Sequence, residues 1–378
     1  EIKEGRTVRY QDPGIVSFEN PEVNAIFDII LEHEFEFDGG GKIKLPKILK
    51  TTKIEIGEGK YSLGIGGLHS NEKSQYLEAG DGILCDWDVQ SYYPAIILQQ
   101  KLSPKSMGKP FLEFYKSLVK RRLDAKATGD KVTADTLKVS INGSFGKLGS
   151  KYSALYAPEL LLQTTLTGQL CLLMLIERME NAGIRIMSAN TDGILCLCPK
   201  ELEREMEIVA WDFLLDTSFI LERTNYRLVA SRDVNNYFGV KADGSVKRKG
   251  CFNLGGLMKN PSRNIVYSSV VEFLKDGAPI EESVRSCEDI NQFVTVRKVT
   301  GGAVFDGELL GKSVRFYSST TAGDECLRYA KNGNKVPLSD GCRPLMDLGE
   351  GLPDDLDYEV YETEAYELLK GVGYGIGT

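Results

Sequence analysis

The chain has 378 residues, 42% of them hydrophobic, and a formal net charge of -8 at pH 7. This length is enough for a sizeable core spread over two or three subdomains. The sequence contains no run of about 18 apolar residues and no signal peptide, so it predicts no membrane span. The acidic balance excludes a generally basic surface, and any contact with a polyanion must come from local basic clusters.

The eight cysteines and two histidines argue against two classes of site. The cysteines form no C-x-x-C pair and no cluster with histidine, which disfavours a zinc centre. Most lie in apolar runs, so we expect buried, reduced thiols and a cytoplasmic protein, in the host cytoplasm if the source is viral. Because His33 and His69 are the only histidines, a hydrolase built on a histidine base is also disfavoured.

The N-terminal part is mixed in character. An apolar helical period over residues 23–34 predicts a helix, and alternation over residues 42–56 predicts strands. The acidic stretch 34–38 could be read as the D-x-E of an exonuclease, but no further set of aspartates supports it, and an exposed strand is the better interpretation. Glycines at 64, 66 and 67 permit close approach of the backbone to another chain or a phosphate, although a plain turn fits as well.

The most informative stretch is residues 82–97. The apolar run at residues 82–85 predicts a buried strand that delivers Asp88 at its end, and a helical run follows Pro94. A carboxylate held where a strand ends and a helix begins suits metal-assisted phosphoryl chemistry. Taken alone, an ordinary capping aspartate explains the pattern equally well.

Two basic helical runs follow, over residues 111–128 and 132–146, and a Gly-Asp turn joins them. On the first run, Arg122 and Lys126 are four residues apart and share a helix face. On the second run, Lys138 and Asn142 are also four residues apart and share a face. Three cations on facing helices would clamp a triphosphate. The alternative is a solvated basic face, the usual fate of a charge run.

Beyond a long apolar helix at residues 157–182, the stretch 184–198 predicts a β-hairpin with Asp192 near its tip. This hairpin could hold the Asp192 carboxylate beside Asp88 on a neighbouring strand. The alternative is an ordinary Asn/Asp/Gly hairpin turn that has no catalytic role.

The C-terminal part begins with strands and ends in a helix. Lys247 and Lys249, just before Gly250, could contact phosphates, or could simply form an exposed strand end. We expect helices at residues 264–275 and 280–294, and then a strand-rich basic region suited to gripping a nucleic-acid backbone.

Three stretches, taken in order, resemble motifs A, B and C of the family B (alpha-like) DNA polymerases. They are residues 88–94, 138–146 and 188–194, against the patterns D-x-x-S-L-Y-P, K-x-x-x-N-S-x-Y-G and Y-x-D-T-D-S. A fourth, residues 247–250, resembles the K-x-K-G segment of that family. The resemblance implies an α+β right-hand polymerase with an antiparallel-sheet palm, short αα-hairpin fingers and a mixed α/β thumb. The implied division is an N-terminal segment with the first part of the palm (1–110), fingers (111–147), the second part of the palm (148–255) and a thumb (256–378).

The resemblance also implies roles for individual residues. The implied catalytic and metal-binding groups are Asp88 and Asp192, which would hold two Mg2+ ions together with the main-chain carbonyl of Val89. The implied dNTP-binding residues are Arg122, Lys126 and Lys138 for the phosphates, Asn142 for position, and Tyr93 as a gate against the ribose 2′-hydroxyl. The implied DNA-binding residues are Gly66, Gly67, Tyr237, Lys247, Lys249 and Gly250.

The implied activity is template-directed addition of dNTPs to a primer 3′-hydroxyl on primer–template DNA, with a nucleic acid favoured as primer. The layout is similar to bacteriophage enzymes and leaves no room for the exonuclease domain of the family, which would be separate or upstream. Two alternatives stay open. A degenerate polymerase kept as a DNA-binding scaffold would explain Asn190, where the family has an aspartate. A reverse transcriptase would lack its Y-x-D-D turn here and would leave the Lys138 helix unexplained.

Overall fold

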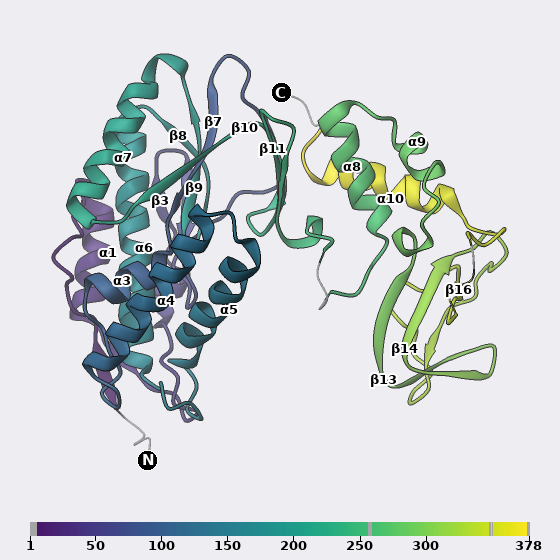
Figure 1. The fold of residues 1–378 in the computed structure, drawn as a ribbon, viewed down its shortest axis with the longest axis horizontal. Coiled ribbons are helices and arrows are strands. Elements are labelled where there is room, and N and C mark those ends of the chain that lie inside the picture. The colour runs from purple at the N-terminus through teal and green to yellow at the C-terminus, as the bar shows by residue number, and fades with distance from the viewer. Residues whose placement is uncertain (1–5, 256–258, 348, 350, 376–378) are drawn as a thin grey trace. The chain divides into compact units, whose positions relative to one another are not determined.

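The computed structural model describes residues 6–255, 259–347, 349 and 351–375, and its elements are labelled in Figure 1. The chain forms two compact units. The first unit comprises Glu1–Glu72 and Glu78–Arg227, and the second comprises Lys73–Leu77 and Leu228–Thr378. Each unit has its own buried hydrophobic cluster, so each satisfies the main physical requirement of a domain.

The first unit is built on an antiparallel sheet with the strand order β10-β7-β9-β8-β5-β4-β3. The bounds of these strands are β3 Ile54–Ile56, β4 Gly59–Ser62, β5 His69–Ser70, β7 Ile83–Val89, β8 Arg185–Asn190, β9 Gly193–Cys198 and β10 Leu221–Asp233, the last passing into the second unit at its end. The predicted strand before Asp88 and the predicted hairpin around Asp192 are confirmed as β7 and as β8 with β9.

One face of this sheet is covered by α6 (Pro158–Asn181), whose middle turns are fully buried. Cys85, Trp87 and Val89 of β7 point into this core, which leaves Asp86 and Asp88 on the opposite face because side chains alternate along a strand. By length and composition α6 could cross a membrane, with a mean hydropathy of 1.5, and it is the one helix of the described residues that could. However, 78% of its most apolar window is buried inside the protein, as in the core helix of a folded domain.

Strand β8 contains a bulge. Its pairing with β9 steps from Ile186 opposite Cys196 to Ser188 opposite Leu195, so Met187 is one residue in excess. Ile186 and Ala189 are both buried in the core. In a regular strand, two residues three positions apart would lie on opposite faces, and the bulge is what places both on the same face.

The remaining helices of the first unit follow local capping and breaking signals. Their bounds are α1 Pro21–Glu32, α2 Lys47–Thr51, α3 Tyr92–Gln99, α4 Lys109–Ala127, α5 Lys131–Lys147 and α7 Glu203–Thr217. The two predicted basic helices are confirmed as α4 and α5, joined where Gly129 takes a positive φ of 75° and Asp130 accepts from the Thr133 amide at 3.1 Å. The prediction of strands throughout 42–56 is wrong, because Pro46 starts the short helix α2.

Among its described residues, the second unit combines short strands, three α-helices and a separate antiparallel sheet in the order β15-β13-β14-β16. The bounds are β6 Gln75–Glu78, β11 Asn236–Lys241, β12 Val246–Arg248, β13 Thr295–Phe305, β14 Glu308–Ser318, β15 Arg328–Tyr329 and β16 Cys342–Pro344, with helices α8 Asn264–Asp276, α9 Ile280–Arg285 and α10 Tyr358–Gly371. The helix predicted at 280–294 is too long: α9 ends at Arg285, and Asp289, whose side chain accepts from the Asn291 amide, starts a separate 3-10 turn.

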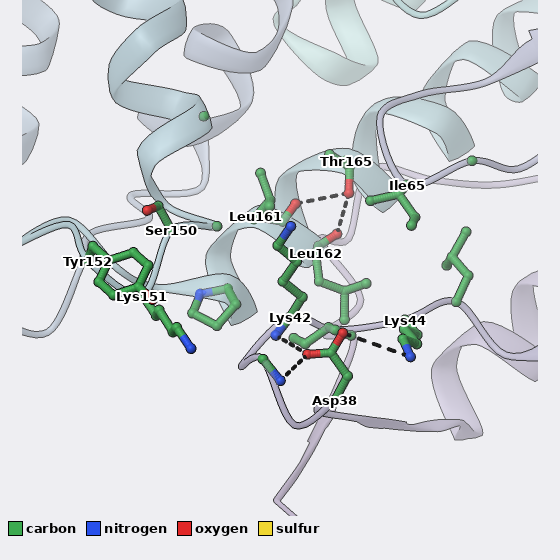
Figure 2. Close-up of a pocket in the computed structure, with 17 residues that line it drawn as sticks. Asp38, Lys42, Lys44, Ile65, Ser150, Lys151, Tyr152, Leu161, Leu162 and Thr165 are labelled. Carbon is green, nitrogen blue, oxygen red and sulfur yellow. Dashed lines mark hydrogen bonds and ion pairs between the residues drawn. The ribbon is translucent and has the colours of Figure 1, made fainter. Parts of the chain in front are cut away.

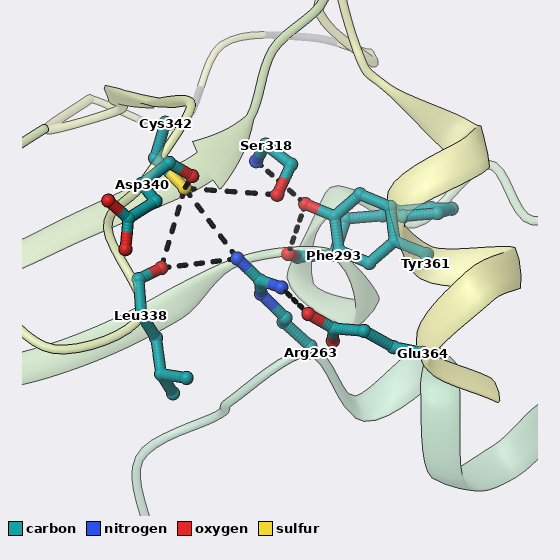
Figure 3. A network of polar contacts seen from close by, with 8 residues as sticks. All are labelled: Arg263, Phe293, Ser318, Leu338, Asp340, Cys342, Tyr361 and Glu364. Atoms are coloured by element: carbon teal, nitrogen blue, oxygen red, sulfur yellow. Dashed lines mark hydrogen bonds and ion pairs between the residues drawn. The ribbon is translucent and has the colours of Figure 1, made fainter. Parts of the chain in front are cut away.

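A buried polar cluster holds the second unit together (Figure 3). Arg263, 7% exposed, pairs with Glu364 of α10 and donates to the Leu338 carbonyl at 3.1 Å. The Tyr361 hydroxyl accepts from the Ser318 amide and donates to the Phe293 carbonyl, both at 2.9 Å. Each of these buried polar groups therefore has a partner, as a stable core requires.

The predicted four-part division remains a prediction. The division into two compact units is coarser, and it separates the chain near Arg227 rather than at 255/256. Residues 256–258, where the predicted thumb begins, lie outside the described residues.

Candidate active site

The backbone segments that carry Asp88 and Asp192 lie next to each other where β7 and β9 pair. Asp88 lies directly opposite Gly193, and the Val89 amide donates to the Asp192 carbonyl at 2.7 Å. A Cβ on Gly193 would lie 2.1 Å from Oδ1 of Asp88, so only glycine leaves room for that carboxylate. Asp88 is half-buried on the sheet and Asp192 is exposed in the turn, which keeps both within reach of solvent and ligands.

The turn that carries Asp192 is strained and buttressed. Thr191 has a left-handed φ of 59°, a conformation that β-branched residues rarely adopt. Its amide donates to the Leu68 carbonyl at 2.8 Å, and a Cβ on Gly67 would lie 2.9 Å from its hydroxyl. The loop at residues 64–68 therefore holds the Asp192 turn in place.

A buried glutamine fixes this loop in turn. Gln169 of α6, 1% exposed, accepts from the Gly64 amide at 2.8 Å and donates to the Gly64 carbonyl at 3.0 Å. Gly66 is exposed and its carbonyl accepts from the Tyr93 hydroxyl, whereas Gly67 is buried. The two glycines predicted to contact DNA thus have different surroundings, and Gln169 had no signal in the sequence beyond its place in an apolar helix.

Tyr93 joins three parts of the site. Its ring stacks on Phe145 of α5 at a centroid distance of 4.7 Å and an angle of 29°. Burial, and after it the charge of Asp192, raises the pKa of the Tyr93 hydroxyl. The structure therefore brings together the Tyr93 helix, the α5 helix and the Asp192 turn.

Two basic residues of α4, Arg122 and Lys126, contact residues close to the end of β7. Arg122 donates from Nη1 to the Ser91 hydroxyl at 2.7 Å, and within the described residues its buried Nε has no acceptor. Lys126 pairs with Glu222 of β10 at 3.0 Å. Lys138 and Asn142 lie on the exposed surface of α5, one or two turns before Phe145.

Glu222 is a site residue that the sequence analysis missed. It lies directly opposite Asp88 in the β7–β10 pairing, and Gln90 donates to its carboxylate at 2.9 Å. Burial alone would raise the pKa of Glu222, but the hydrogen bonds from Gln90 and Lys126 outweigh it and lower that pKa. Only the pairing of distant strands places Glu222 here, so no local motif could have revealed it.

The remaining predicted DNA-binding residues belong to the second unit. Tyr237 lies on β11, Lys247 on β12, and the Lys249 amide donates to the Tyr237 carbonyl at 2.9 Å. Gly250 has a positive φ of 60°, and a Cβ there would lie 2.3 Å from the Asn235 carbonyl oxygen. The backbone geometry therefore favours glycine at position 250 whether or not this segment contacts DNA.

The two carboxylates Asp88 and Asp192 suit Mg2+, which needs few protein ligands, better than a metal ion that takes all its ligands from the protein. The described residues contain no group of three or more His, Cys, Asp or Glu side chains that could hold an ion. Mg2+ characteristically takes one or two carboxylates and completes its shell with water and substrate phosphates. The two carboxylates are compatible with that mode.

Comparisons with known proteins bear on the family and the fold. No family profile matches the chain. A stretch of 122 residues is 31% identical to DNA polymerase 1 of Saccharolobus solfataricus and 29% identical to DNA polymerase 1 of Sulfolobus acidocaldarius. That stretch is 32% of this chain and 14% of each relative. The family B DNA polymerase of Pyrobaculum calidifontis has a similar fold, with a TM-score of 0.50 at 14% identity over 89% of this chain and 49% of the polymerase.

The chain is thus partly homologous to archaeal DNA polymerases, and its mixed α/β fold is similar to that of a family B DNA polymerase. The resemblance drawn from the motifs is confirmed at this coarse level. The chain spans about half the length of the polymerase with the similar fold and a smaller part of its sequence relatives. The roles of individual residues stay predictions.

Proposed function

We propose that this protein is a template-directed DNA polymerase that adds dNTPs to a primer 3′-hydroxyl. The observation that carries the proposal is the pairing of Asp88 opposite Gly193, which sets the motif A carboxylate beside the Asp192 turn. Around this pair lie the stacked rings of Tyr93 and Phe145 and the guanidinium of Arg122, whose buried Nε has no acceptor among the described residues. A phosphoryl-transfer site needs this combination of metal-binding oxygens and phosphate-binding cations.

Different residues of the chain would bind the metal ions and the nucleotide. Asp88 and Asp192, with the Val89 carbonyl, would hold two Mg2+ ions, which supply a more acidic 3′-hydroxyl and neutralise charge on the triphosphate. Arg122, Lys126 and Lys138 would bind the phosphates, and Asn142 would help hold the nucleotide in position. Most of the rate enhancement then comes from orientation and charge stabilisation, and no histidine is needed.

Tyr93 would select the sugar. Its hydroxyl is held by the Gly66 carbonyl and its ring by Phe145, so the side chain cannot easily turn away from a bulky substrate. A ribose 2′-hydroxyl would meet this fixed ring, and deoxynucleotides would be preferred. Tyr237, Lys247 and Lys249 of the second unit would contact the DNA backbone. The bacteriophage-like character and a separate exonuclease belong to the same proposal.

Primer extension tests the proposal. Wild-type protein, Asp88→Ala, Asp192→Ala and the exposed control Asp212→Ala on α7 are mixed with primed template, Mg2+ and dNTPs. We expect extension by the wild type and the control, and a loss of at least about 1,000-fold in both active-site variants with primer–template binding retained. Extension that survives in either active-site variant would mean that the wrong carboxylates are named.

One observation favours a second candidate, a DNA-binding scaffold without catalysis. Asn190, at the end of β8, stands where the family pattern has its first motif C aspartate. The same experiment separates the two functions. A scaffold would bind primer–template equally well with Mg2+ or with EDTA and would extend no primer.

A further inference from the structure

A cavity in the first unit adjoins the proposed active site (Figure 2). Its volume is about 670 Å3, and Ile65 and Gly146 are among the residues that line it. The carbonyl of Gly66, next to Ile65, accepts from the Tyr93 hydroxyl, and Phe145, next to Gly146, stacks on the Tyr93 ring. The cavity therefore belongs to the site already described, whereas a surface on the other side of the sheet has no part in it.

That surface is the outer face of α7, which presents three large apolar side chains to solvent. Ile208, Trp211 and Leu215 are 42%, 60% and 64% exposed. Their spacing of three and then four residues places them in one stripe, like the a and d positions of a coiled coil. Single exposed apolar side chains are ordinary on a protein surface, but a stripe that includes a tryptophan marks an interaction site.

The opposite face of α7 is anchored in the core of the first unit. Met206, Ala210 and Phe213 are buried, and the Cys85 thiol of β7 donates to the Met206 sulfur at 3.7 Å. Cys85 lies on the core face of the sheet, and Asp88 lies on the other face because side chains alternate along a strand. The stripe therefore points away from the sheet on the side remote from Asp88, and a partner bound there would leave the proposed active site open.

Acidic side chains flank the stripe. Glu205 and Asp212 are seven residues apart and form a row beside it, at positions that correspond to e of a coiled coil. Both are exposed, and neither has an ion pair within the part of the chain that the structure describes. On the other flank, Glu207 shares Arg223 with Glu203, at 3.1 and 2.7 Å. One guanidinium thus faces two carboxylates there.

The surface of α7 as a whole is negative. The helix has five acidic side chains and one basic one, Arg204. Two arginines of neighbouring elements add to it: Arg178 of α6 pairs with Asp216 at 2.8 Å, and Arg223 of β10 pairs as described above. Five carboxylates against three guanidinium groups leave an excess of negative charge around the apolar stripe.

The sign of this charge narrows the choice of partner. A nucleic acid or an anionic membrane would be repelled. A second copy of the chain would bring two acidic flanks together, and like charges across an interface cost affinity. A helix with apolar side chains on the stripe and Lys or Arg beside them meets both requirements, because the charged e and g positions select the partner when helices pair.

We propose that the α7 stripe is the docking site of a basic amphipathic helix from a partner protein. The helix packs along Ile208, Trp211 and Leu215, and its Lys or Arg side chains pair with Glu205 and Asp212. This inference goes beyond the proposed function and does not depend on it, because none of these residues belongs to the proposed active site. The docked helix tethers the partner while the Asp88 face of the sheet stays free.

Synthetic peptides serve as probes of this surface. The first is a tryptophan-free helix of about 21 residues with Leu at a and d and Lys at e and g. A second peptide has Glu in place of Lys, and a third has Ser in place of Leu. Trp211 reports binding directly, because the chain has two tryptophans and the other, Trp87, is only 7% exposed. Binding should shift the Trp211 emission to shorter wavelength and protect it from quenching by acrylamide.

The first pair of variants tests the apolar stripe. Ile208→Ala/Leu215→Ala removes two of its side chains and keeps Trp211 as the reporter. The matched control, Ile48→Ala/Leu309→Ala, removes the same two kinds of side chain at exposed positions elsewhere. We expect the stripe variant to lose at least about tenfold in affinity for the Leu/Lys peptide, and the control to stay within about twofold. The peptide with Ser in place of Leu should bind the wild type at least about tenfold more weakly than the Leu/Lys peptide.

The second pair of variants tests the charge. Glu205→Lys/Asp212→Lys reverses two charges beside the stripe, and Glu282→Lys/Asp324→Lys makes the same change at exposed positions of the second unit. The wild type should prefer the Leu/Lys peptide to the Leu/Glu peptide by at least about tenfold. The first variant should reverse this preference and the control should keep it. Since both variants have the same net charge, non-specific attraction cannot produce that difference.

Three results would overturn the proposal. The first is a Trp211 emission that does not respond to the Leu/Lys peptide, and the second is binding that survives in both surface variants. The third is self-association of the free chain, measured by sedimentation velocity, that Trp211→Glu abolishes, because a second copy would then cover the stripe. None of these measurements involves primer extension, so the failure of this inference and the failure of the proposed function are distinguishable.

Discussion

Two adjacent glycines show how differently neighbouring residues can contribute to one site. A Cβ at position 67 would collide with Thr191, while a Cβ at position 66 would meet nothing within 4 Å. We therefore predict that Gly67→Ala displaces the Asp192 turn and lowers primer-extension kcat by about 10- to 100-fold, since small misplacements of reacting groups are costly. Gly66→Ala should stay within about twofold. The reverse order, with Gly66→Ala the more damaging, would indicate that the loop acts by touching DNA.

Under the proposed function, Glu222 would compete with the triphosphate for Lys126. In the structure the carboxylate holds the lysine, and both side chains are a little over 40% exposed, so the ion pair is worth no more than about 1 kcal/mol. Glu222→Gln should free Lys126 for the triphosphate and lower KM for dNTP by up to about fivefold. Steady-state single-nucleotide insertion measures this.

Asp124→Asn is the matched control, because it breaks the exposed Lys120–Asp124 pair on the same helix. It should leave KM unchanged. An unchanged or raised KM in Glu222→Gln would show that Glu222 assists Asp88 instead of restraining Lys126.

At the scale of elements, Asp355 ties the end of β14 to the segment before α10. Its carboxylate accepts from Ser319 at 2.5 Å, Thr321 at 2.7 Å and Tyr317 at 2.8 Å. Burial would raise the pKa of Asp355, but these hydrogen bonds outweigh it and lower that pKa to about 2. A carboxyl whose pKa is lower in the folded state stabilises the fold above its ordinary pKa of 3.8, and this stability is lost as the pH falls towards 2.

Asp355→Asn should therefore be less stable than the wild type at pH 5 to 7, and the difference should shrink as the pH falls from about 4 to 2. Urea unfolding over this range, followed at β14, gives the measurement. The exposed neighbour Asp354→Asn serves as the control and should show no such convergence. A difference that is constant with pH would contradict the role given to the charge.

Local elements were largely predictable, and their long-range partners were not. The break at Gly129 and Asp130 located α4 and α5 because it is a turn and a helix cap in one dipeptide. The Asp192 hairpin was equally visible, since two apolar arms flank a polar turn. In contrast, Glu222 and Gln169 act through partners that are 96 or more residues away in the sequence, and no periodicity in a single segment encodes such a pairing.

At the scale of the whole molecule, each of the two units has its own core, and the Tyr361 hydroxyl bridges two backbone groups inside the second. Tyr361→Phe leaves the Ser318 amide and the Phe293 carbonyl without this partner, at a cost of about 1–3 kcal/mol. Hydrogen exchange should then show reduced protection for β14 and unchanged protection for β9. A loss spread evenly over both strands would contradict a local role.

Similarity of fold extends further along the chain than similarity of sequence. The related stretch covers 32% of the chain, while the similar fold covers 89% at only 14% identity. A fold can persist while sequence identity falls, because core positions need only apolar side chains of suitable size. The predicted α+β class is thus supported only as a mixed α/β fold, and the four-part division stays a prediction.

The bulge at Met187 has a consequence for how the length of this hairpin can change in evolution. Removing Met187 would leave every described pairing between β8 and β9 in place, because Ile186 already faces Cys196 and Ser188 already faces Leu195. Removing a residue such as Leu195 from β9 would instead turn the rest of the strand inside out. We therefore expect homologues that differ in length in this hairpin to have gained or lost a residue at the position of Met187. The turn that carries Asp192 would keep its conformation in them.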